Sequence, residues 1–348
     1  MFACRGLQPK KCFSKRLVAS RNGRAYHSVR DHLSEEELGQ LQRITRLPVV
    51  HHEGYVCPLP PKHRFQMMKF HHLYKILIKD GVIDQQKQVI EPKQVSREVA
   101  GTVHSRTYVN KFFDGSTSEQ EQRVTGFKWT PGLASRVRYE TGGTLLAGKI
   151  CLDRGLACST GGGTHHAFPD YGSGYCLIND LAVTAYRLIE SGLVTKVMIV
   201  DLDVHQGDGT AFIFQNRLDI FTLSLHCQNN FPLRKQESDL DVGLDVGLGD
   251  TGYMRILSEY LPATIDKFHP DVILYDAGVD PHEKDQLGKL KLTDQGLYNR
   301  DMFVLKTAIC RGIPVMTVIG GGYDEILALS ARHSIIHRVA TEVWNSYL

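Results

Sequence analysis

The sequence lacks the features that mark membrane, disulfide-rich and nucleic-acid-binding proteins. No stretch approaches the run of about eighteen apolar residues that a transmembrane helix requires, so no membrane span is expected. The eight cysteines include no CxxC pair, which argues against a disulfide framework or a zinc knuckle and fits a reducing compartment. The formal net charge of +3 is too small to indicate a nucleic-acid partner. The remaining composition is that of a globular protein with a sizeable core.

Acidic residues are absent from the first thirty positions, which contain eight basic side chains. Serines and apolar residues are interspersed among them, and such an arginine-rich, acid-free leader resembles a mitochondrial transit peptide. The sequence Arg24-Ala25-Tyr26, just before His27, resembles a processing site. We therefore interpret residues 1–26 as a transit peptide, the alternative being a disordered basic leader. The expected location is mitochondrial, and otherwise cytoplasmic or nuclear.

The segment after the leader is predicted to contain one short helix. Ser34-Glu35-Glu36-Glu37 has the pattern of a capping box, so a helix is expected from there to about Ile44. Residues 27–46 are thus a short N-terminal helix and linker, followed by a catalytic domain over residues 47–345. No internal repeat and no break in composition follows residue 45, which indicates a single domain.

Strand-like and helix-like segments alternate from about residue 146 onward. Amphipathic segments around 178–189 and 293–309 have helical periodicity, and each ends near a glycine. Between them stand short, β-branched apolar runs of the kind found in strands buried on both faces: 196–203, 219–226, 271–280 and 313–322. This alternation predicts the α/β class, with a mostly parallel central sheet and helices on both faces.

Each of these four predicted strands ends in polar residues or in glycines followed by a tyrosine. In an open parallel sheet the ligand crevice lies beyond the carboxyl ends of the strands, so these tips are expected to meet. The alternative is that each polar residue caps the helix after it. Four tips with complementary chemistry favour a shared site. The tips are Asp201-Leu202-Asp203-Val204-His205, Leu225-His226, Asp276-Ala277-Gly278-Val279-Asp280 and Gly320-Gly321-Gly322-Tyr323.

The first tip contains a D-x-H pair that suits a metal ion. Asp203 and His205 are alternate residues of an extended segment, so both side chains can reach one ion. Asp280, from another tip, is the obvious third ligand. Three protein ligands with one open position is the usual arrangement of a catalytic zinc site.

A histidine pair and a tyrosine supply further candidates. His165-His166 follows three glycines, and two adjacent imidazoles are suited to act as base and acid if carboxylates set their tautomers. Asp201 and Asp208 are available for that purpose. Tyr323, after three more glycines, could place a phenol on the oxyanion of a tetrahedral intermediate, or simply begin the next helix.

Taken together, these motifs resemble the histone deacetylase family, the zinc-dependent amidohydrolase branch of the arginase/deacetylase fold. The resemblance spans roughly residues 47–340 and implies a sheet of about eight strands. The segment LPPKHRFQMMKF resembles the compact bacterial-type or class IV-like members more than the large nuclear ones. The matching motifs are GGTLLAG, TGGGTHHAFPDYGSGYCLIND, DLDVHQGDG, DAGVDPHEKDQLGKL and IGGGYD.

The resemblance assigns roles to the candidate residues. Zinc, or ferrous iron in cells, would be held by Asp203, His205 and Asp280. His165 would pair with Asp201, and His166, the general base, would pair with Asp208. Tyr323 would stabilise the oxyanion.

The resemblance also implies an acyl tunnel and a potassium site. Gly174 and Tyr175 would line the tunnel, with Phe231 as its other wall. Potassium would bind the side chains of Asp201 and Ser224 and the backbone oxygens of three residues. Those three are Asp203, His205 and Leu225.

Two features depart from the family pattern. Tyr175 replaces the frequent tunnel phenylalanine, and Gln206 replaces a frequent second histidine. The sequence has no clear counterpart of the rim aspartate that grips the peptide backbone.

The leading hypothesis is a metal-dependent hydrolase that removes acetyl or longer acyl groups from the lysine side chains of proteins. The alternatives are an acetylpolyamine or other small-amide deacetylase and, as a different class, a catalytically silent module that binds acylated lysine. A two-metal, arginase-like site would need further D-x-H-x-D motifs, which are absent. The expected partner is an acylated protein or small acylated amine, with no nucleic acid; the oligomeric state is left open.

Overall fold

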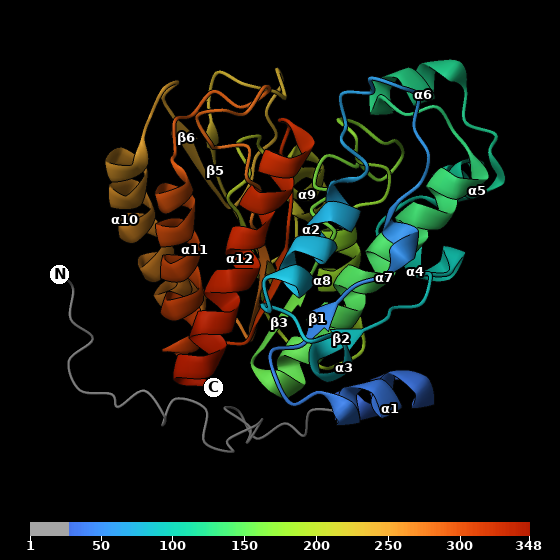
Figure 1. The fold of residues 1–348 in the computed structure, drawn as a ribbon. Coiled ribbons are helices and arrows are strands. Elements are labelled where there is room, and N and C mark those ends of the chain that lie inside the picture. Colours follow the sequence, from blue (N-terminus) through green and yellow to red (C-terminus); the bar gives the residue numbers. More distant parts are fainter. Residues whose placement is uncertain (1–27) are drawn as a thin grey trace.

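A computed structural model describes residues 28–348, and the predicted leader at residues 1–26 lies outside them (Figure 1). Within this part of the chain, eight strands form one sheet in which all neighbours are parallel, in the order β2-β1-β3-β8-β7-β4-β5-β6. The strands are β1 (Val49–Val50), β2 (Val89–Ile90), β3 (Leu156–Ser159), β4 (Val197–Asp201), β5 (Ile220–Cys227), β6 (Leu240–Leu244), β7 (Val272–Asp276) and β8 (Val315–Val318). The predicted α/β fold is confirmed, with a sheet that is wholly rather than mostly parallel.

Helices cover both faces of the sheet. Val197 and Ile199 of β4 belong to the core on one face with α7 and α8, whereas Met198 and Val200 belong to the core on the other face with α2, α10, α11 and α12. Successive strand residues thus point to opposite layers, and both are apolar because neither face meets water. The helices are α1 (Glu35–Arg43), α2 (Lys69–Lys79), α3 (Gln85–Gln88), α4 (Arg97–Ala100), α5 (Arg106–Asp114), α6 (Glu119–Thr125), α7 (Pro131–Arg154), α8 (Asp180–Glu190), α9 (Asp208–Phe214), α10 (Asp250–Phe268), α11 (Asp294–Ile309) and α12 (Ile326–Tyr347). None of those within the described residues is long and apolar enough to cross a membrane.

The predicted elements differ from the observed ones mainly at their ends. The capping box before α1 is present, since the Ser34 hydroxyl accepts from the Glu37 N–H and the Glu37 carboxylate accepts from the Ser34 N–H. The runs 271–280 and 313–322, however, stop being strands at Asp276 and Val318. Beyond these points the backbone turns into loops whose polar groups bind one another, so the strand tips are shorter than the sequence indicates.

A buried arginine forms hydrogen bonds with the loops that follow two of these strands. Arg300 of α11 is fully buried, and its guanidinium donates to the carbonyls of Gly278 at 2.6 Å and Leu202 at 3.2 Å. It also donates to the Ala277 carbonyl at 3.2 Å and, through Nε, to Asp301 at 2.9 Å. A single side chain therefore binds the loops that follow β4 and β7.

Replacing Arg300 with methionine is expected to lower the free energy of unfolding by about 3–5 kcal/mol, because Asp301 and several carbonyls would stay buried without a donor. Chemical denaturation measures the loss. Arg187→Met, which removes a surface ion pair with Glu190, is the control and should cost less than about 1 kcal/mol. Equal losses for the two variants would contradict this role of Arg300.

A second stability prediction concerns His337, which is fully buried on α12. Burial lowers the pKa of its imidazole to about 4, from the ordinary value of 6.5. Between these two pH values the unfolded chain binds a proton at His337 that the folded protein does not. The free energy of unfolding therefore decreases as the pH falls below 6.5. His337→Leu removes this pH-dependent decrease in the free energy of unfolding. Its stability relative to the natural protein should therefore improve by about 1.4 kcal/mol between pH 7.5 and 5.5.

Unfolding of both proteins in urea at the two pH values tests this expectation. Ser334→Ala, a buried but non-titrating change on the same helix, should differ from the natural protein by the same amount at both pH values. A His337→Leu difference that is constant with pH would rule out the proposed titration.

Candidate active site

The tips of four adjacent strands meet at one edge of the sheet. His165 and His166 follow β3, Asp203 and His205 follow β4, and the two remaining tips come after β7 and β8. These strands are neighbours in the order β3-β8-β7-β4, so residues far apart in the sequence are brought together at their carboxyl ends. Three of the four predicted tips, those of β4, β7 and β8, are therefore observed to meet, and the segment after β3 joins them. The fourth, Leu225-His226, lies within β5 itself.

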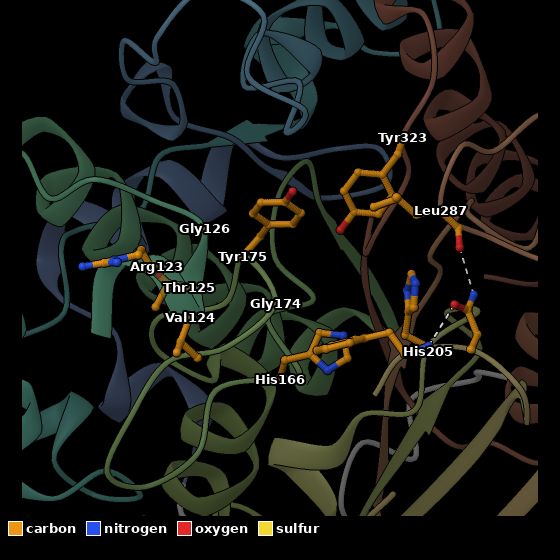
Figure 2. Close-up of a pocket in the computed structure, with 12 residues that line it drawn as sticks. Arg123, Val124, Thr125, Gly126, His166, Gly174, Tyr175, His205, Leu287 and Tyr323 are labelled. Carbon is orange, nitrogen blue, oxygen red and sulfur yellow. Dashed lines mark hydrogen bonds between the residues drawn. The ribbon is translucent and has the colours of Figure 1, made fainter. Parts of the chain in front are cut away.

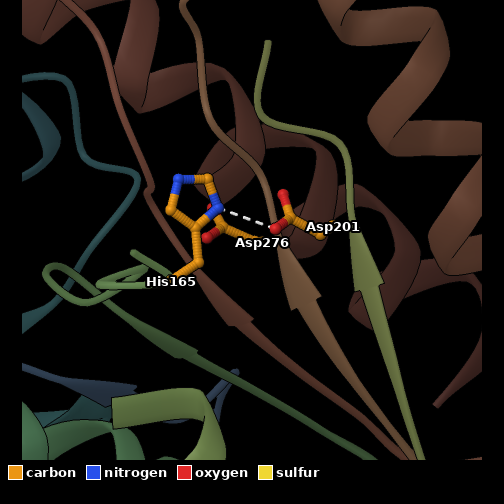
Figure 3. Close-up of side chains that lie close together, drawn as sticks. All are labelled: His165, Asp201 and Asp276. Atoms are coloured by element: carbon orange, nitrogen blue, oxygen red, sulfur yellow. Dashed lines mark hydrogen bonds and ion pairs between the residues drawn. The ribbon is translucent and has the colours of Figure 1, made fainter. Parts of the chain in front are cut away.

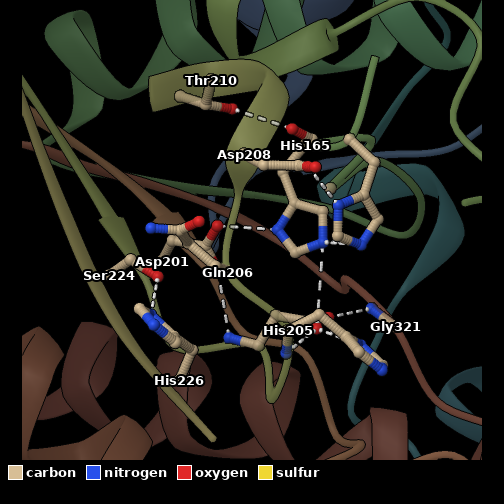
Figure 4. A network of polar contacts seen from close by, with 12 residues as sticks. His165, Asp201, His205, Gln206, Asp208, Thr210, Ser224, His226 and Gly321 are labelled. Atoms are coloured by element: carbon tan, nitrogen blue, oxygen red, sulfur yellow. Dashed lines mark hydrogen bonds and ion pairs between the residues drawn. The ribbon is translucent and has the colours of Figure 1, made fainter. Parts of the chain in front are cut away.

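Asp203, His205 and Asp280 form a compact, buried group. Their ligand atoms all lie within 4.8 Å of one another. His205 Nδ1 is 3.0 Å from Asp203 Oδ1 and 3.1 Å from Asp280 Oδ2. The other oxygen of Asp203 accepts from the Gly321 N–H at 2.8 Å, which fixes the carboxylate (Figure 4). Two carboxylates and one imidazole at this spacing are a donor set that suits a divalent metal ion with an open position.

The charges in this group also fit a bound cation. Burial of the His205 ring lowers its pKa, but Asp280 and Asp203 together raise it to about 10. Burial and the neighbouring Asp203 raise the pKa of Asp280 to about 7. A proton on His205 therefore offsets part of the negative charge of the two carboxylates, and a cation that takes its place binds more tightly as the pH rises.

The two adjacent histidines each bind a different aspartate. His165 Nδ1 lies 2.7 Å from Asp201 Oδ2, and His166 Nδ1 lies 2.6 Å from Asp208 Oδ1 (Figures 3 and 4). The two Nε2 atoms are 3.1 Å apart. Gly163, with φ of 93°, adopts a left-handed conformation that a side chain disfavours, and a Cβ there would lie 2.6 Å from the Gly320 Cα. This turn directs both rings toward the candidate metal group.

The two imidazoles have opposite pKa shifts. Burial lowers the pKa of His165, but Asp201 and Asp203 raise it well above 6.5, so this ring carries a proton at neutral pH. Burial and the charge of His165 lower the pKa of His166 to about 4, so that ring is neutral. Because the Nδ1–H of His166 donates to Asp208, its Nε2 is an acceptor, and it faces the protonated Nε2 of His165 at 3.1 Å. The geometry therefore offers one proton acceptor next to one proton donor.

A cavity of about 350 Å³ leads to these groups (Figure 2). Gly174, Tyr175 and Phe231, the predicted tunnel residues, all line it, and Leu287 completes the wall. The Phe231 ring lies 4.9 Å from the His166 ring, centroid to centroid. An extended apolar chain entering the cavity would end beside the histidines.

Tyr323 forms part of the same wall. Its ring centroid is 5.8 Å from that of Tyr175 and 6.4 Å from that of His205, and Figure 2 shows its hydroxyl directed into the cavity. Burial and the nearby Asp280 raise the pKa of the phenol well above 10. The hydroxyl therefore remains a hydrogen-bond donor at neutral pH.

The residues expected to bind potassium lie on β4, β5 and the turn after β4. Asp201 and Ser224 are direct partners in the β4–β5 register, which places their side chains on the same face of the sheet. Ser224 Oγ lies 2.9 Å from His226 Nδ1, and Leu225 is the next residue of β5. The structure thus places two of the five expected donors, Asp201 and Ser224, next to each other.

Asp180 is a structural part of the site that sequence reasoning missed. It begins α8, and its carboxylate accepts from the N–H groups of Gly163 at 3.0 Å and Thr164 at 2.8 Å. It also accepts from the hydroxyls of Thr164 and Thr144. The aspartate therefore anchors the turn that carries the two histidines. The signal that the sequence offered for this role is an aspartate at the start of a helix, shortly after the GSGYC loop.

Lys69 was missed for a different reason. It is almost fully buried on α2, where a lysine would normally face water, and its ammonium donates to the Gly320 carbonyl at 3.2 Å. Burial lowers its pKa to about 8. With the buried Arg136–Glu140 pair it lines a cavity of about 30 Å³ behind the histidines. No sequence pattern indicates this position.

A group of side chains that could hold a metal ion lies beside two paired histidines at the tips of a parallel sheet, an arrangement that suits a metal-dependent hydrolase. Comparison with known families narrows this class. The family model described as the histone deacetylase domain matches residues 63–338. The chain belongs to the histone deacetylase family.

Individual relatives agree with this assignment. An uncharacterized protein of a Picosynechococcus strain is 49% identical over 85% of this chain and 99% of its own length. Histone deacetylase 2 of Arabidopsis thaliana is 30% identical, over 78% of this chain and 73% of its own. The acetoin utilization protein AcuC of Staphylococcus aureus is 26% identical, over 82% and 80%. The crystal structure of the HDA15 HD domain has the same fold, with a TM-score of 0.71 at 22% identity over 84% of this chain and 90% of that one.

Proposed function

We propose that the protein is a zinc-dependent amidohydrolase that removes acetyl or longer acyl groups from lysine side chains of proteins. The observation that supports this proposal best is the position of one buried donor group. Asp203, His205 and Asp280 lie within 4.8 Å of one another, and His205 lines the same cavity as His166 and Tyr323. A cavity lined by His205 of this donor group and by the neutral His166 suits hydrolysis of an amide at the end of a long side chain.

The donor set fits zinc, and ferrous iron would be held by the same three side chains. Bound there, the ion would lower the pKa of a water molecule and polarise the amide carbonyl. The remaining chemistry belongs to the protein. The Nε2 of His166 takes the proton from the attacking water, and the Tyr323 hydroxyl donates to the oxyanion that forms. A histidine, His165 being already protonated, returns a proton to the departing amine.

We also propose a structural potassium ion at the side chains of Asp201 and Ser224, with backbone oxygens of Asp203, His205 and Leu225. Asp201 is the carboxylate that orients His165, so a cation on its free side would fix that contact. The support is the β4–β5 register, which places Asp201 beside Ser224.

An acetylpolyamine or other small amide is the second candidate substrate, and one relative is named for the utilization of a small molecule, acetoin. The wall of the cavity argues against a polyamine. Among the described residues that line it, Arg123 is a cation and none is a carboxylate. A polyamine would leave its distant ammonium groups without a partner there, whereas an acyl-lysine carries its amide on an apolar stem. The lysine substrate is therefore favoured.

Amine release by the zinc-loaded protein tests the proposal. The panel consists of acetyl-, butyryl- and long-chain acyl-lysine peptides beside acetylated polyamines. We expect hydrolysis of one or more of the peptides and a preference for one acyl length. Hydrolysis of acetylated polyamines alone would identify the protein as a small-molecule deacetylase instead. Binding of acyl-lysine peptides without any hydrolysis would instead favour a silent binding module.

A further inference from the structure

Tyr323 lies in a segment without regular secondary structure. β8 ends at Val318 and α12 begins at Ile326, and three glycines precede the tyrosine. Gly320 has a positive φ of 60°, so this stretch follows a path that ordinary side chains disfavour. A phenol that must act at one point of the cavity therefore needs contacts from elsewhere to hold its backbone.

Those contacts come from the segment after β7. One oxygen of Asp285 accepts from the Tyr323 N–H at 2.7 Å. The Gln286 N–H donates in turn to the Tyr323 carbonyl at 2.8 Å. Both polar backbone groups of Tyr323 are thus bound to two consecutive residues of a different loop.

The other oxygen of Asp285 organises that loop itself. It accepts from the N–H groups of Leu287 at 2.8 Å and Gly288 at 2.7 Å. Gly288 lies so close to Asp280 that a Cβ on it would be 1.9 Å from the Asp280 carbonyl oxygen. One carboxylate therefore joins three parts of the site: the loop of a candidate metal ligand, the cavity wall at Leu287 and the candidate oxyanion donor.

We propose that Asp285 is a positioning residue for Tyr323, and through it for the hydrolysis described under the proposed function, on which this inference rests. Asp285 neither lines the cavity nor belongs to the candidate metal group. Its hydrogen bond to the Tyr323 N–H sets the position of the tyrosine backbone relative to the Asp203–His205–Asp280 group, and Tyr323 and Leu287 both line the cavity (Figure 2). Hydrogen bonds to a carboxylate are strong, and a displacement of about 1 Å at a reacting group can cost a hundredfold in rate.

Asp285→Asn tests the contact selectively. The asparagine oxygen can still accept from Leu287 and Gly288, while its amide group then faces the Tyr323 N–H, donor against donor. We expect kcat to fall by roughly tenfold to a hundredfold, with KM within about threefold and zinc content unchanged.

Asp271 provides a matched control. One of its oxygens accepts from the N–H groups of Thr195 at 2.7 Å and Lys196 at 2.9 Å, just before β4. It thus joins two loops as Asp285 does, but at the opposite edge of the sheet. Asp271→Asn should lower the melting temperature as much as Asp285→Asn does and leave kcat within about twofold. If both variants lose kcat equally, the role of Asp285 is only structural and the proposal is wrong.

A double-mutant cycle identifies the target of Asp285. In a Tyr323→Phe background the phenol is already missing, so adding Asp285→Asn should reduce kcat by less than about twofold further. If the loss of kcat in the double variant equalled the product of the losses in the two single variants, Asp285 would act through some other group, and the proposal would be wrong.

Amide hydrogen exchange gives a readout that needs no activity. In the full chain, Asp285→Asn should speed exchange of the Tyr323 amide by at least about tenfold. The Gly321 amide, which donates to Asp203, is the internal reference and should not change. Unchanged exchange at Tyr323 would refute the positioning contact. If the natural protein hydrolysed no substrate, the proposed function would fail while this exchange result would still decide whether Asp285 holds Tyr323.

Discussion

Replacement of Asp203 by alanine is expected to lower kcat/KM for acyl-lysine hydrolysis by about a thousandfold or more and to abolish stoichiometric metal binding. Asp203 supplies one of two carboxylates in the donor group, and no other described carboxylate occupies its position beside His205. The fold should persist, because the change also removes one of two like charges buried next to each other. Activity, metal content by mass spectrometry and far-ultraviolet circular dichroism give the three readings.

Asp266→Ala is the control for this experiment, since that aspartate pairs with Arg311 at the surface. It should retain both metal and activity. If Asp203→Ala kept one equivalent of zinc and more than about a tenth of the natural kcat/KM, Asp203 would not be a metal ligand. The assignment of the metal site to this group would then be wrong.

Tyr323→Phe is expected to reduce kcat by about a hundredfold to a thousandfold while leaving KM and metal content nearly unchanged. The variant loses only the hydroxyl that is directed into the cavity. Because burial raises the pKa of the phenol well above 10, the natural protein has this donor available at neutral pH. An effect on kcat without one on KM is typical of an interaction made in the transition state.

Steady-state kinetics on the preferred acyl-lysine peptide measures the effect. Tyr260→Phe removes a hydroxyl from a partly exposed tyrosine on α10 and serves as the control, with kcat expected within about twofold. Near-normal turnover by Tyr323→Phe would show that the tyrosine hydroxyl takes no part in hydrolysis. The proposed positioning role of Asp285 would then also be wrong.

The sequence predicts the centre of the sheet better than its edges. Strands β4, β5, β7 and β8 lie in apolar, β-branched runs, and these runs are visible because both faces are buried. β1 and β2 contain only two residues each, so they exist through pairing with distant neighbours rather than through any local pattern. β6 is an edge strand whose exposed and half-buried residues alternate, and its sequence does not differ from that of a loop.

Within the site, the sequence indicates the chemical residues but not the groups that hold them. Asp203, His205 and Tyr323 stand at strand tips next to glycines, where the pattern draws attention to them. Lys69 and Arg300 do not, because their partners are backbone carbonyls from other parts of the chain, and such contacts leave no periodic signal in the sequence.

The opposite pKa shifts of the two touching imidazoles have a consequence for the exchange of protons with solvent. His165 carries a proton and His166 is neutral, their Nε2 atoms are 3.1 Å apart, and both rings are almost completely buried. The proton taken from water and the proton given to the amine can therefore both be handled inside the site. Turnover then needs no proton from buffer between the two transfers, and its rate should be independent of buffer concentration. In this sense the histidine pair acts as a closed relay.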